Sequence, residues 1–449
     1  MPDTLPGRHL YEPMAYGPAP IADNFWRTTA TPPACPPIDG AQHCETAVIG
    51  AGFTGLNAAL ALARAGQDVV VLDANQPGWG ASGRNGGFCC LGGAKLDFDG
   101  LAKRHGAGAA RDYLDAERAA VDHVAALLAD HGIEADTHSR GETLLAHRAS
   151  RIAALQDGAA YYQRHYGIAP TVLPREALPE HGLSSPEFHG ALTVPIGFAL
   201  NPMKYIAGLT DAARAAGARL HGNSPVAALR RDATGAHLLH TPTGTIRATN
   251  LILATNGYGA EDLPRWLGGR VLPVQSSILV TRPLSGHELS AQGWTSRQMS
   301  YDTRHLLHYF RLLPDNRMLF GLRADYRATP AGFAATRKRA RRDFDRMFPA
   351  WRGVDTAHFW SGLVALARNL TPFAGQVPGM DNTWAALCYH GNGVAMGSYA
   401  GRLLAARITG TGPPTPGLMS APLRRFELGS WRRLILPLVY GWYEIQDRI

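Results

Sequence analysis

The chain has 449 residues, of which 45% are hydrophobic and 18% are charged, and its formal net charge is +8. This composition excludes a small disulfide-stabilised protein and an intrinsically disordered chain. No run of about 18 or more apolar residues occurs, and residues 1–20 lack the cationic start and apolar segment of a secretory signal. We therefore expect a globular, cytoplasmic protein without a transmembrane segment.

Neither the cysteines nor the basic residues indicate a metal site or a nucleic-acid partner. The five cysteines include no CxxC pair and no histidine at metal-binding spacing. The one dense basic run, residues 337–342, lies among apolar residues at helical intervals, Phe333, Ala340, Phe344 and Met347. The pattern predicts the solvated face of an amphipathic helix rather than a surface for an anionic partner.

Residues 1–44 are rich in proline and lack periodicity, which predicts an extended N-terminal arm with Phe25 and Trp26 as a packing anchor. Beyond the arm, a strand pattern at 45–49, a helix pattern at 54–65 and a valine-rich strand pattern at 68–72 form a β-α-β unit. Two parallel strands joined by a helix imply a sheet covered on both faces, and thus an α/β domain.

The middle of the chain changes in character between about residues 259 and 330. Helix patterns precede this region at 112–129, 150–166 and 203–216. Strand-like runs within it, separated by turns, lie at 271–282, 306–313 and 317–323. They predict an inserted antiparallel sheet. An α/β pattern returns with a strand at 383–389 and a helix to about residue 408, so we expect the first domain to be discontinuous.

The strongest motif is Gly50-Ala51-Gly52-Phe53-Thr54-Gly55, between the first strand pattern and the first helix pattern. Gly50 permits a tight turn, Gly52 lets the backbone approach a pyrophosphate, and Gly55 lets helix and strand pack closely. The helix N-terminus adds unpaired N–H donors and a positive dipole end. Asp73 ends the next strand pattern, where a carboxylate accepts hydrogen bonds from an adenosine ribose. Together these features predict a dinucleotide-binding site.

A second loop of small residues, 80–87, follows the acidic strand end and suits a cofactor that runs deep through the domain, which favours FAD. The rival interpretation is a nicotinamide nucleotide site at 391–397, where GxGxxxG stands between a strand and a helix pattern. We reject it because no strand ending in an acid follows that helix. Without an NAD(P)H domain, electrons must come from the substrate and leave to oxygen or another acceptor.

With these motifs the chain resembles the D-amino-acid oxidase/glycine oxidase family of FAD-dependent oxidoreductases, and it is most similar to the gamma-glutamylputrescine oxidase branch. The resemblance covers most of residues 24–408. The matching stretches are 24–26, 48–55, 80–87, 201–205, Val226, 254–257, 309–311, 360–362 and 389–394. The resemblance implies an α/β fold with an α+β insert: a Rossmann-like FAD-binding domain and a discontinuous antiparallel-sheet substrate domain.

On this basis we divide the chain into four parts. Residues 45–98, 187–258 and 356–410 are expected to form the FAD-binding domain, and residues 99–186 and 259–355 the substrate domain. Residues 1–44 are the arm. The tail, 411–449, contains an apolar stretch at 434–443 that is too short to span a bilayer, so we expect the tail to pack on the body.

The resemblance also implies which positions hold the cofactor. The ADP half would be held by Gly50, Ala51, Gly52, Phe53, Thr54, Gly55, Asp73 and Ala74. The pyrophosphate and the flavin ring would be contacted by Gly80, Ala81, Ser82, Arg84, Asn85, Gly86 and Gly87. The backbone of Val226 would face the adenine, and the cofactor would be lined by Ala254, Thr255, Asn256 and Gly257. The flavin pyrimidine would be faced by Gly391, Asn392, Gly393 and Val394, at a helix start whose N–H groups suit negative charge.

Some members of the family attach FAD covalently, through a histidine in the loop after the acidic strand or a cysteine near the start of the C-terminal portion. Here the loop offers Arg84 and Asn85, and residues 363–371 contain no cysteine, so we expect non-covalent FAD. Cys89 and Cys90 lie near enough to leave a covalent link open, although small buried residues beside a cofactor loop also explain them.

Flavin amine oxidation requires a neutral amine with its α C–H over flavin N5, so a protein acid or base is not obligatory. Leu307, Tyr309 and Arg311 share one face of a strand pattern, and Arg311 either binds a substrate carboxylate or is solvated or paired. His390, beside the flavin-facing turn, either orders the substrate or bonds to the backbone. The candidate substrate-orienting residues are Arg311, His390 and Tyr309.

The predicted function is an FAD-dependent amine or amino-acid oxidase. A hydride would pass from the carbon next to the amine to flavin N5, the imine would hydrolyse, and oxygen would reoxidise FAD to give hydrogen peroxide. Two alternatives stay open: an amine or D-amino-acid dehydrogenase with a quinone or carrier acceptor, and an FAD-binding protein without turnover. The expected partners are a small-molecule amine and oxygen.

Overall fold

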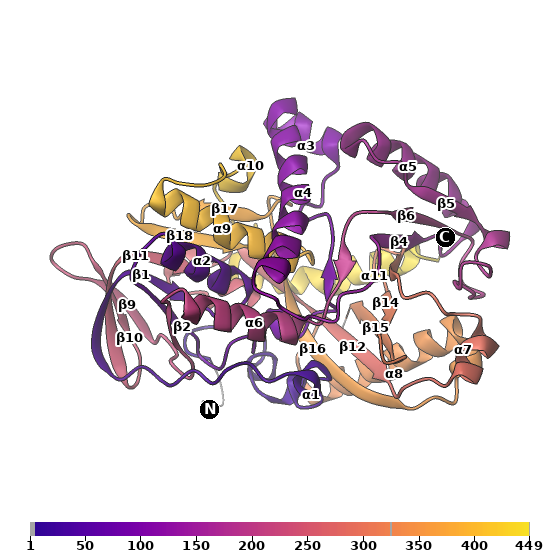
Figure 1. Cartoon of the computed structure of the whole chain (residues 1–449), viewed down its shortest axis with the longest axis horizontal. Coiled ribbons are helices and arrows are strands. Elements are labelled where there is room, and N and C mark those ends of the chain that lie inside the picture. The colour runs from indigo at the N-terminus through magenta and orange to yellow at the C-terminus, as the bar shows by residue number, and fades with distance from the viewer. Residues whose placement is uncertain (1–4, 324–325, 449) are drawn as a thin grey trace.

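The computed structural model describes residues 5–323 and 326–448. Residues 1–4 of the expected arm, residues 324–325 in the region of the expected inserted sheet, and Ile449 of the tail lie outside the described residues. Two eight-stranded sheets organise the described chain, and Figure 1 places the first at the left of the molecule and the second at the right. The expected fold class, α/β with an inserted, mostly antiparallel sheet, is confirmed.

The first sheet is built around the predicted β-α-β unit. Strand β1 (Gly40–Ile49) leads into α2 (Phe53–Arg64), and β2 (Val69–Leu72) lies parallel to β1. All residues of β2 are buried, as expected for a strand covered on both faces. Strand β1 begins at Gly40 because residues 40–44 continue its parallel pairing with β11 (Gly244–Leu253). The end of the expected arm therefore belongs to this sheet.

The first sheet has the strand order β17, β18, β11, β1, β2 and β8, and the hairpin of β9 and β10 continues it beside β11. Its further strands are β8 (Arg219–His221), β9 (Ala228–Arg231), β10 (His237–His240), β17 (Phe373–Gln376) and β18 (Thr383–Leu387). Helices α6 (Pro202–Ala215) and α9 (Ala395–Thr409) pack beside α2 on one face, where they share a core with Val48, Val69 and Val71. The helices predicted at 203–216 and up to about residue 408 are confirmed.

The second sheet has the order β16, β12, β15, β14, β13, β4, β6 and β5. Its neighbours pair antiparallel, except that β13 runs parallel to β4. Its strands are β4 (Glu142–Leu145), β5 (Thr171–Pro174), β6 (Gly190–Val194), β12 (Val271–Thr281), β13 (Met299–Asp302), β14 (Tyr309–Leu312), β15 (Met318–Arg323) and β16 (Thr356–Ala367). A separate two-stranded pair joins β3 (Phe88–Cys89) and β7 (Phe198–Ala199).

Two strands correct the expected domain boundaries. Strand β6 pairs with β4 and β5, and β16 pairs with β12 along nearly its whole length, so both belong to the second sheet. The domain boundaries expected from the sequence assign both strands to the FAD-binding domain. Pairing partners distant in sequence decide this membership, and neither strand carries a local signal of its partner. Strand β14 is also shorter than the predicted 306–313.

Helices α3 (Phe98–His105), α4 (Ala107–Asp130), α5 (Ile152–Tyr166), α7 (Gly286–Gln292) and α8 (Pro330–Met347) complete the main elements. Helix α8 confirms the predicted amphipathic pattern, because Ala340, Phe344 and Met347 are buried while Arg337 and Lys338 are exposed. Helix α4 begins earlier than the predicted residue 112, because Gly106 separates it from α3.

The arm packs where the sequence predicts its anchor. Phe25 and Trp26 are buried, and Trp26 opens the short helix α1 (Trp26–Thr29). The Trp26 Nε1–H donates to the Asn85 carbonyl at 2.8 Å, and the Asn24 side-chain amide donates to the Gly83 carbonyl at 2.8 Å. The arm therefore supports the loop at 80–87 from outside.

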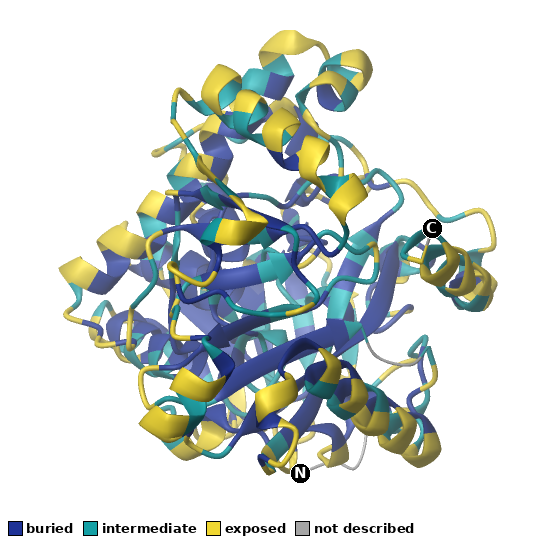
Figure 2. Ribbon diagram, turned by 90° about the vertical axis from the view of Figure 1, so that its right-hand side faces the viewer, coloured by how far each residue is buried: buried dark blue, intermediate teal, exposed yellow. Residues whose placement is uncertain are grey.

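The tail contacts the body and still leaves apolar surface exposed. It contains α10 (Gly417–Ser420) and α11 (Leu436–Gln446), and the buried Arg432 pairs with Glu261. Figure 2 shows the C-terminal helix projecting from the body with a largely exposed surface, and Trp431 and Leu438 are 71% and 74% exposed. Within the described residues, no helix combines the length and the apolar character that crossing a membrane requires.

Candidate active site

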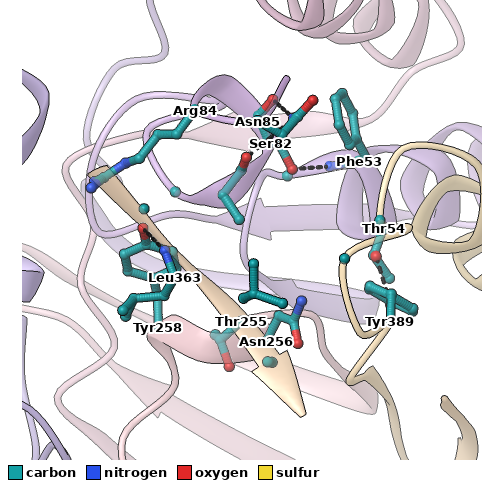
Figure 3. A pocket seen from close by; sticks show the side chains of 18 of the residues that line it. Phe53, Thr54, Ser82, Arg84, Asn85, Thr255, Asn256, Tyr258, Leu363 and Tyr389 are labelled. Carbon is teal, nitrogen blue, oxygen red and sulfur yellow. Dashed lines mark hydrogen bonds between the residues drawn. The ribbon is translucent and has the colours of Figure 1, made fainter. Parts of the chain in front are cut away.

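A cavity of about 490 Å³ is lined by residues of both sheets and of the loops between them. The expected cofactor positions that line it are Gly50, Gly52, Phe53, Thr54, Asp73, Ala74, Gly80, Ala81, Ser82, Arg84, Asn85, Gly86, Val226, Ala254, Thr255, Asn256, Gly391, Asn392, Gly393 and Val394. Ala51, Gly55, Gly87 and Gly257 lie next to lining residues in the chain. Figure 3 shows the lining from the α2 start to the 254–256 segment.

The glycines of the first motif are required by backbone contacts. Gly50 has a φ of +109°, which side chains rarely adopt, and a Cβ there would lie 2.8 Å from the Ala254 carbonyl oxygen. A Cβ on Gly55 would lie 1.8 Å from the Gly50 carbonyl oxygen. A Cβ on Gly52 would point at Ser82, 2.7 Å from its Oγ. Helix α2 can therefore begin close to β1 only because these positions lack side chains.

Asp73 holds the turn after β1 and faces the cavity. Its Oδ2 accepts from the Ala51 N–H at 2.7 Å, and its Oδ1 accepts from the Asn75 N–H at 2.9 Å. Burial raises the pKa of Asp73 to about 6, although both N–H groups act to lower it. A carboxylate has further acceptor positions beyond these two bonds, so Asp73 fits the hydroxyl groups of a ribose.

The loop at 80–87 is tied to the start of α2 and to itself. The Phe53 N–H donates to Ser82 Oγ at 2.9 Å (Figure 3). The Asn85 side-chain amide donates to the Ser82 carbonyl at 2.8 Å, and its Oδ1 accepts from the Gly87 N–H at 2.8 Å. These bonds fix a loop of small residues against a helix N-terminus, an arrangement suited to phosphate oxygens.

Arg84 carries an unpaired buried charge beside this loop. Its Nε donates to the Trp79 carbonyl at 2.8 Å, and its guanidinium lies 4.3 Å from the Trp79 ring centroid. Its Nη2 is buried without a hydrogen-bond partner, and burial lowers its pKa. No carboxylate of the described residues pairs with it. A buried cation without a counter-ion fits an anionic ligand, so Arg84, the glycine turns and Asp73 together fit FAD.

The turn before α9 brings a second helix N-terminus to the cavity. The Tyr389 hydroxyl lies 2.8 Å from Thr54 Oγ1, which donates to the Gly397 carbonyl, so the starts of α2 and α9 are joined. His390 has a φ of +52°. Its Nδ1–H donates to the Gly93 carbonyl at 2.6 Å, and its Nε2 accepts from the Ala367 N–H at 3.0 Å. Burial lowers the pKa of His390 to about 4, so the neutral ring is occupied by backbone at both nitrogens.

Arg311 requires a correction. Its side chain is buried and does not line the cavity. Its Nε donates to the Gly86 carbonyl at 2.9 Å, its Nη2 donates to the Leu200 carbonyl at 2.7 Å, and its Nη1 lies 2.9 Å from His138 Nε2. Each nitrogen of the guanidinium therefore has a protein partner, and the geometry assigns the side chain to holding the 80–87 loop rather than to a substrate carboxylate.

Leu307 and Tyr309 line the cavity, and the Tyr309 hydroxyl lies 3.0 Å from Ser276 Oγ. Other residues that line this end of the cavity were not predicted from the sequence. They are Lys95, Glu142, Tyr162, Tyr301 and Arg323, together with Cys90, whose place in the lining was also not predicted. They come from five separate segments without a shared motif. The adjacent glycines Gly92 and Gly93, just before Lys95, are a local sequence signal that the backbone is closely packed here. Both have a positive φ, and a Cβ would meet Asn392 at the first and Tyr113 at the second.

The comparisons with known proteins agree with this site. The family described as DAO, FAD dependent oxidoreductase, matches residues 45–407. The chain is 30% identical to the probable oxidoreductase OrdL of Rhizobium meliloti, over 96% of this chain and 99% of that protein. It is 28% identical to gamma-glutamylputrescine oxidoreductase of Escherichia coli, over 90% of this chain and 93% of that protein.

Solved structures show the same fold. Glycine oxidase from Geobacillus kaustophilus superposes with a TM-score of 0.68 at 21% identity, over 84% of this chain and 98% of that one. L-proline dehydrogenase from P. horikoshii gives a TM-score of 0.69 at 17% identity, over 86% and 97% of the two chains. With the family match over most of its length and a cavity whose residues fit the cofactor, the chain belongs to the DAO family of FAD-dependent oxidoreductases.

Proposed function

We propose that this oxidoreductase acts on amines or amino acids and that oxygen is its electron acceptor. The observation that carries the proposal is the continuity of one cavity from Asp73 and Arg84 to Leu307 and Tyr309. A substrate held at the far end thus shares one cavity with the proposed cofactor positions. Relatives named for gamma-glutamylputrescine and for glycine support the amine class.

When bound, FAD supplies a two-electron oxidation that takes a hydride from the carbon next to the amine and gives the electrons to oxygen, forming hydrogen peroxide. The protein holds the neutral amine with that carbon toward the cofactor and excludes water. We assign the orienting wall to Leu307 and Tyr309. The substrate ammonium first loses a proton to solvent and becomes the neutral amine. The iminium that remains after the hydride has left takes up water to give an aldehyde or an oxo acid and ammonium or a protonated amine.

The proposed FAD is non-covalent. Cys89 is buried away from the cavity, and Cys90, which lines it, has a thiol pKa raised by burial. A thiol that stays protonated is a poor nucleophile, which supports a cofactor without a covalent link. Denaturation in acid should therefore release all yellow colour as FAD. Colour retained by the precipitated protein would contradict the non-covalent assignment, and released FMN would contradict the FAD assignment.

Lys95 and Arg323 replace Arg311 as the proposed ligands for a carboxylate. Both line the cavity near the flavin-facing turn, and a Cβ on Gly391 would lie 3.9 Å from Arg323 Nη2. The Lys95 side chain is exposed to the cavity, and desolvation and then the charge of Arg323 act to lower its pKa. Two adjacent cations favour an anionic group between them, such as the carboxylate of an amino acid.

A substrate panel tests the function. Anaerobic mixing of FAD-loaded protein with primary amines, secondary amines and amino acids should bleach the flavin with at least one class. Admission of air should then restore the colour with formation of hydrogen peroxide. Bleaching followed by recovery only with a quinone would assign a dehydrogenase instead. A flavin that no member of the panel bleaches would contradict an amine-oxidising function.

A further inference from the structure

One wall of the cavity, remote from Arg84, is acidic and aromatic. Glu142 on β4, Tyr162 on α5, Tyr301 on β13 and Cys90 after β3 all line the cavity. In the parallel pairing of β4 with β13, Glu142 lies opposite Met299 and Leu144 lies opposite Tyr301. Glu142 and Tyr301 are therefore near neighbours on one side of adjacent strands. We call Glu142, Tyr162 and Tyr301 the acidic wall.

Glu142 has no cation to balance it within the described part of the chain. Its side chain is 6% exposed. The groups that act on it are the Cys90 thiol, which donates a hydrogen bond, and Glu117, which is a like charge. Burial raises the pKa of Glu142 to about 7, and the charge of Glu117 raises it further. Glu142 is thus a buried carboxylate that opens onto a cavity and lacks a positive partner.

Glu117 provides the contrast. It lies behind the wall on α4 and does not line the cavity. The Tyr166 hydroxyl donates to Glu117 Oε2 at 2.5 Å. Glu117 is therefore held by a protein donor behind the wall. Of the two carboxylates, only Glu142 lines the cavity and can meet a ligand there.

The acidic wall is connected to the flavin-facing turn. The Asn392 side-chain amide donates to Cys90 Sγ at 3.3 Å, and the Cys90 thiol donates to Glu142. One side chain, that of Cys90, thus stands between Glu142 and Asn392 of the turn at 391–394. Lys95 and Arg323 approach the same cavity, but neither acts on Glu142. The wall therefore lies beside the flavin-facing turn, and neither of the two cations balances its charge.

We propose that Glu142, flanked by Tyr162 and Tyr301, binds a second, protonated ammonium group of the substrate. A charge-assisted hydrogen bond from the ammonium to the carboxylate and contact with tyrosine ring faces recognise such a group. The substrate is then a diamine or an amine with a distal ammonium group, and its other, neutral amine is the one oxidised. This inference rests on the proposed amine oxidation.

The test compares wild type with Glu142→Gln as FAD-loaded protein. Anaerobic flavin bleaching is followed against concentration of aliphatic diamines and of monoamines of the same chain length. We expect wild type to bind diamines more tightly. In Glu142→Gln the apparent Kd for diamines should rise roughly ten- to a hundredfold, and the Kd for monoamines should change far less. Glu117→Gln is the matched control: it removes a like charge from behind Glu142, so the preference for diamines should be kept or strengthened and not lost.

A second measurement does not depend on turnover. A diamine whose α-carbons are fully methylated has no hydrogen to give, so its binding to oxidised protein is read by calorimetry. Its affinity should fall in Glu142→Gln and persist in Glu117→Gln. Equal losses for diamines and monoamines, or a wild-type preference for monoamines, would overturn the subsite. Binding of the methylated diamine without bleaching by any amine would instead contradict the proposed function and leave the subsite supported.

Discussion

The two ends of the cavity are built in different ways. The nucleotide end uses residues 50–55, Asp73 and 80–86, all within one β-α-β unit and the loop after it. The substrate end uses Cys90, Glu142, Tyr162, Tyr301 and Arg323, which arrive from separate elements. Binding a pyrophosphate needs backbone geometry that a short motif encodes. Binding a particular amine needs side chains whose meeting depends on the packing of the whole second sheet.

Two buried arginines show the same difference. Arg84 lines the cavity with an unpartnered Nη2, whereas each nitrogen of Arg311 has a protein partner: the carbonyls of Gly86 and Leu200 and the ring of His138. Burial alone does not identify a ligand-binding arginine. The informative property is whether protein acceptors already satisfy the guanidinium.

The largest expected effect is at the nucleotide end. Gly52→Val places a branched side chain where Ser82 Oγ lies and where the pyrophosphate is expected, so FAD retention should be lost. Absorbance of the purified protein and acid-released FAD measure this. Gly108→Ala is the matched control, because a Cβ there meets no atom within 4 Å, and its FAD content should be normal. A folded Gly52→Val protein with full FAD content would contradict the assignment.

The next effect is on stability. Arg311→Met leaves the Gly86 and Leu200 carbonyls unpaired, so the free energy of unfolding should fall by about 3 kcal/mol or more. Chemical denaturation of the FAD-loaded protein measures this. The folded protein should bind carboxylated and uncharged amines in the wild-type ratio. A selective loss of carboxylated amines would restore Arg311 as a substrate ligand.

Arg84→Met should mainly weaken FAD binding, whereas Arg311→Met should mainly lower stability. Removal of a charge-assisted contact to an anionic cofactor should weaken FAD binding roughly ten- to a hundredfold. The apoprotein should lose less stability than Arg311→Met, because Arg84 Nη2 has no protein partner to lose whereas every nitrogen of Arg311 has one. Titration of apoprotein with FAD measures the affinity for FAD, and chemical denaturation of the apoprotein measures its free energy of unfolding. Unchanged FAD affinity would place Arg84 outside the cofactor site.

The smallest effect is a pH dependence. Burial raises the pKa of Glu117 to about 7, so the folded state holds its proton where the unfolded state has released it. This contribution to stability is present below the unfolded pKa and is lost as the pH rises through 7. Between pH 6 and 8 wild type should lose about 1 kcal/mol relative to Glu117→Gln. Parallel stability curves for the two proteins would contradict the raised pKa.

Local chemistry explains what was predictable. The β-α-β unit, the glycine turns and Asp73 were predicted from sequence, because steric limits on φ and close backbone contact act between residues near in the chain. The anchoring role of Phe25 and Trp26 and the amphipathic face of α8 followed from composition and periodicity in the same way. These features can be predicted without knowing which distant element packs against them.

The sequence by itself determined the cofactor class and the α/β framework, whereas the tertiary structure decided the substrate end. In the structure, β6 and β16 pair within the second sheet, and Arg311 lies outside the cavity. Both ring nitrogens of His390 are hydrogen-bonded to backbone groups. It also brought Glu142 to the cavity without a cation. The physical reason is that the role of a charged side chain depends on which distant groups already satisfy it, and only the folded chain brings those groups together.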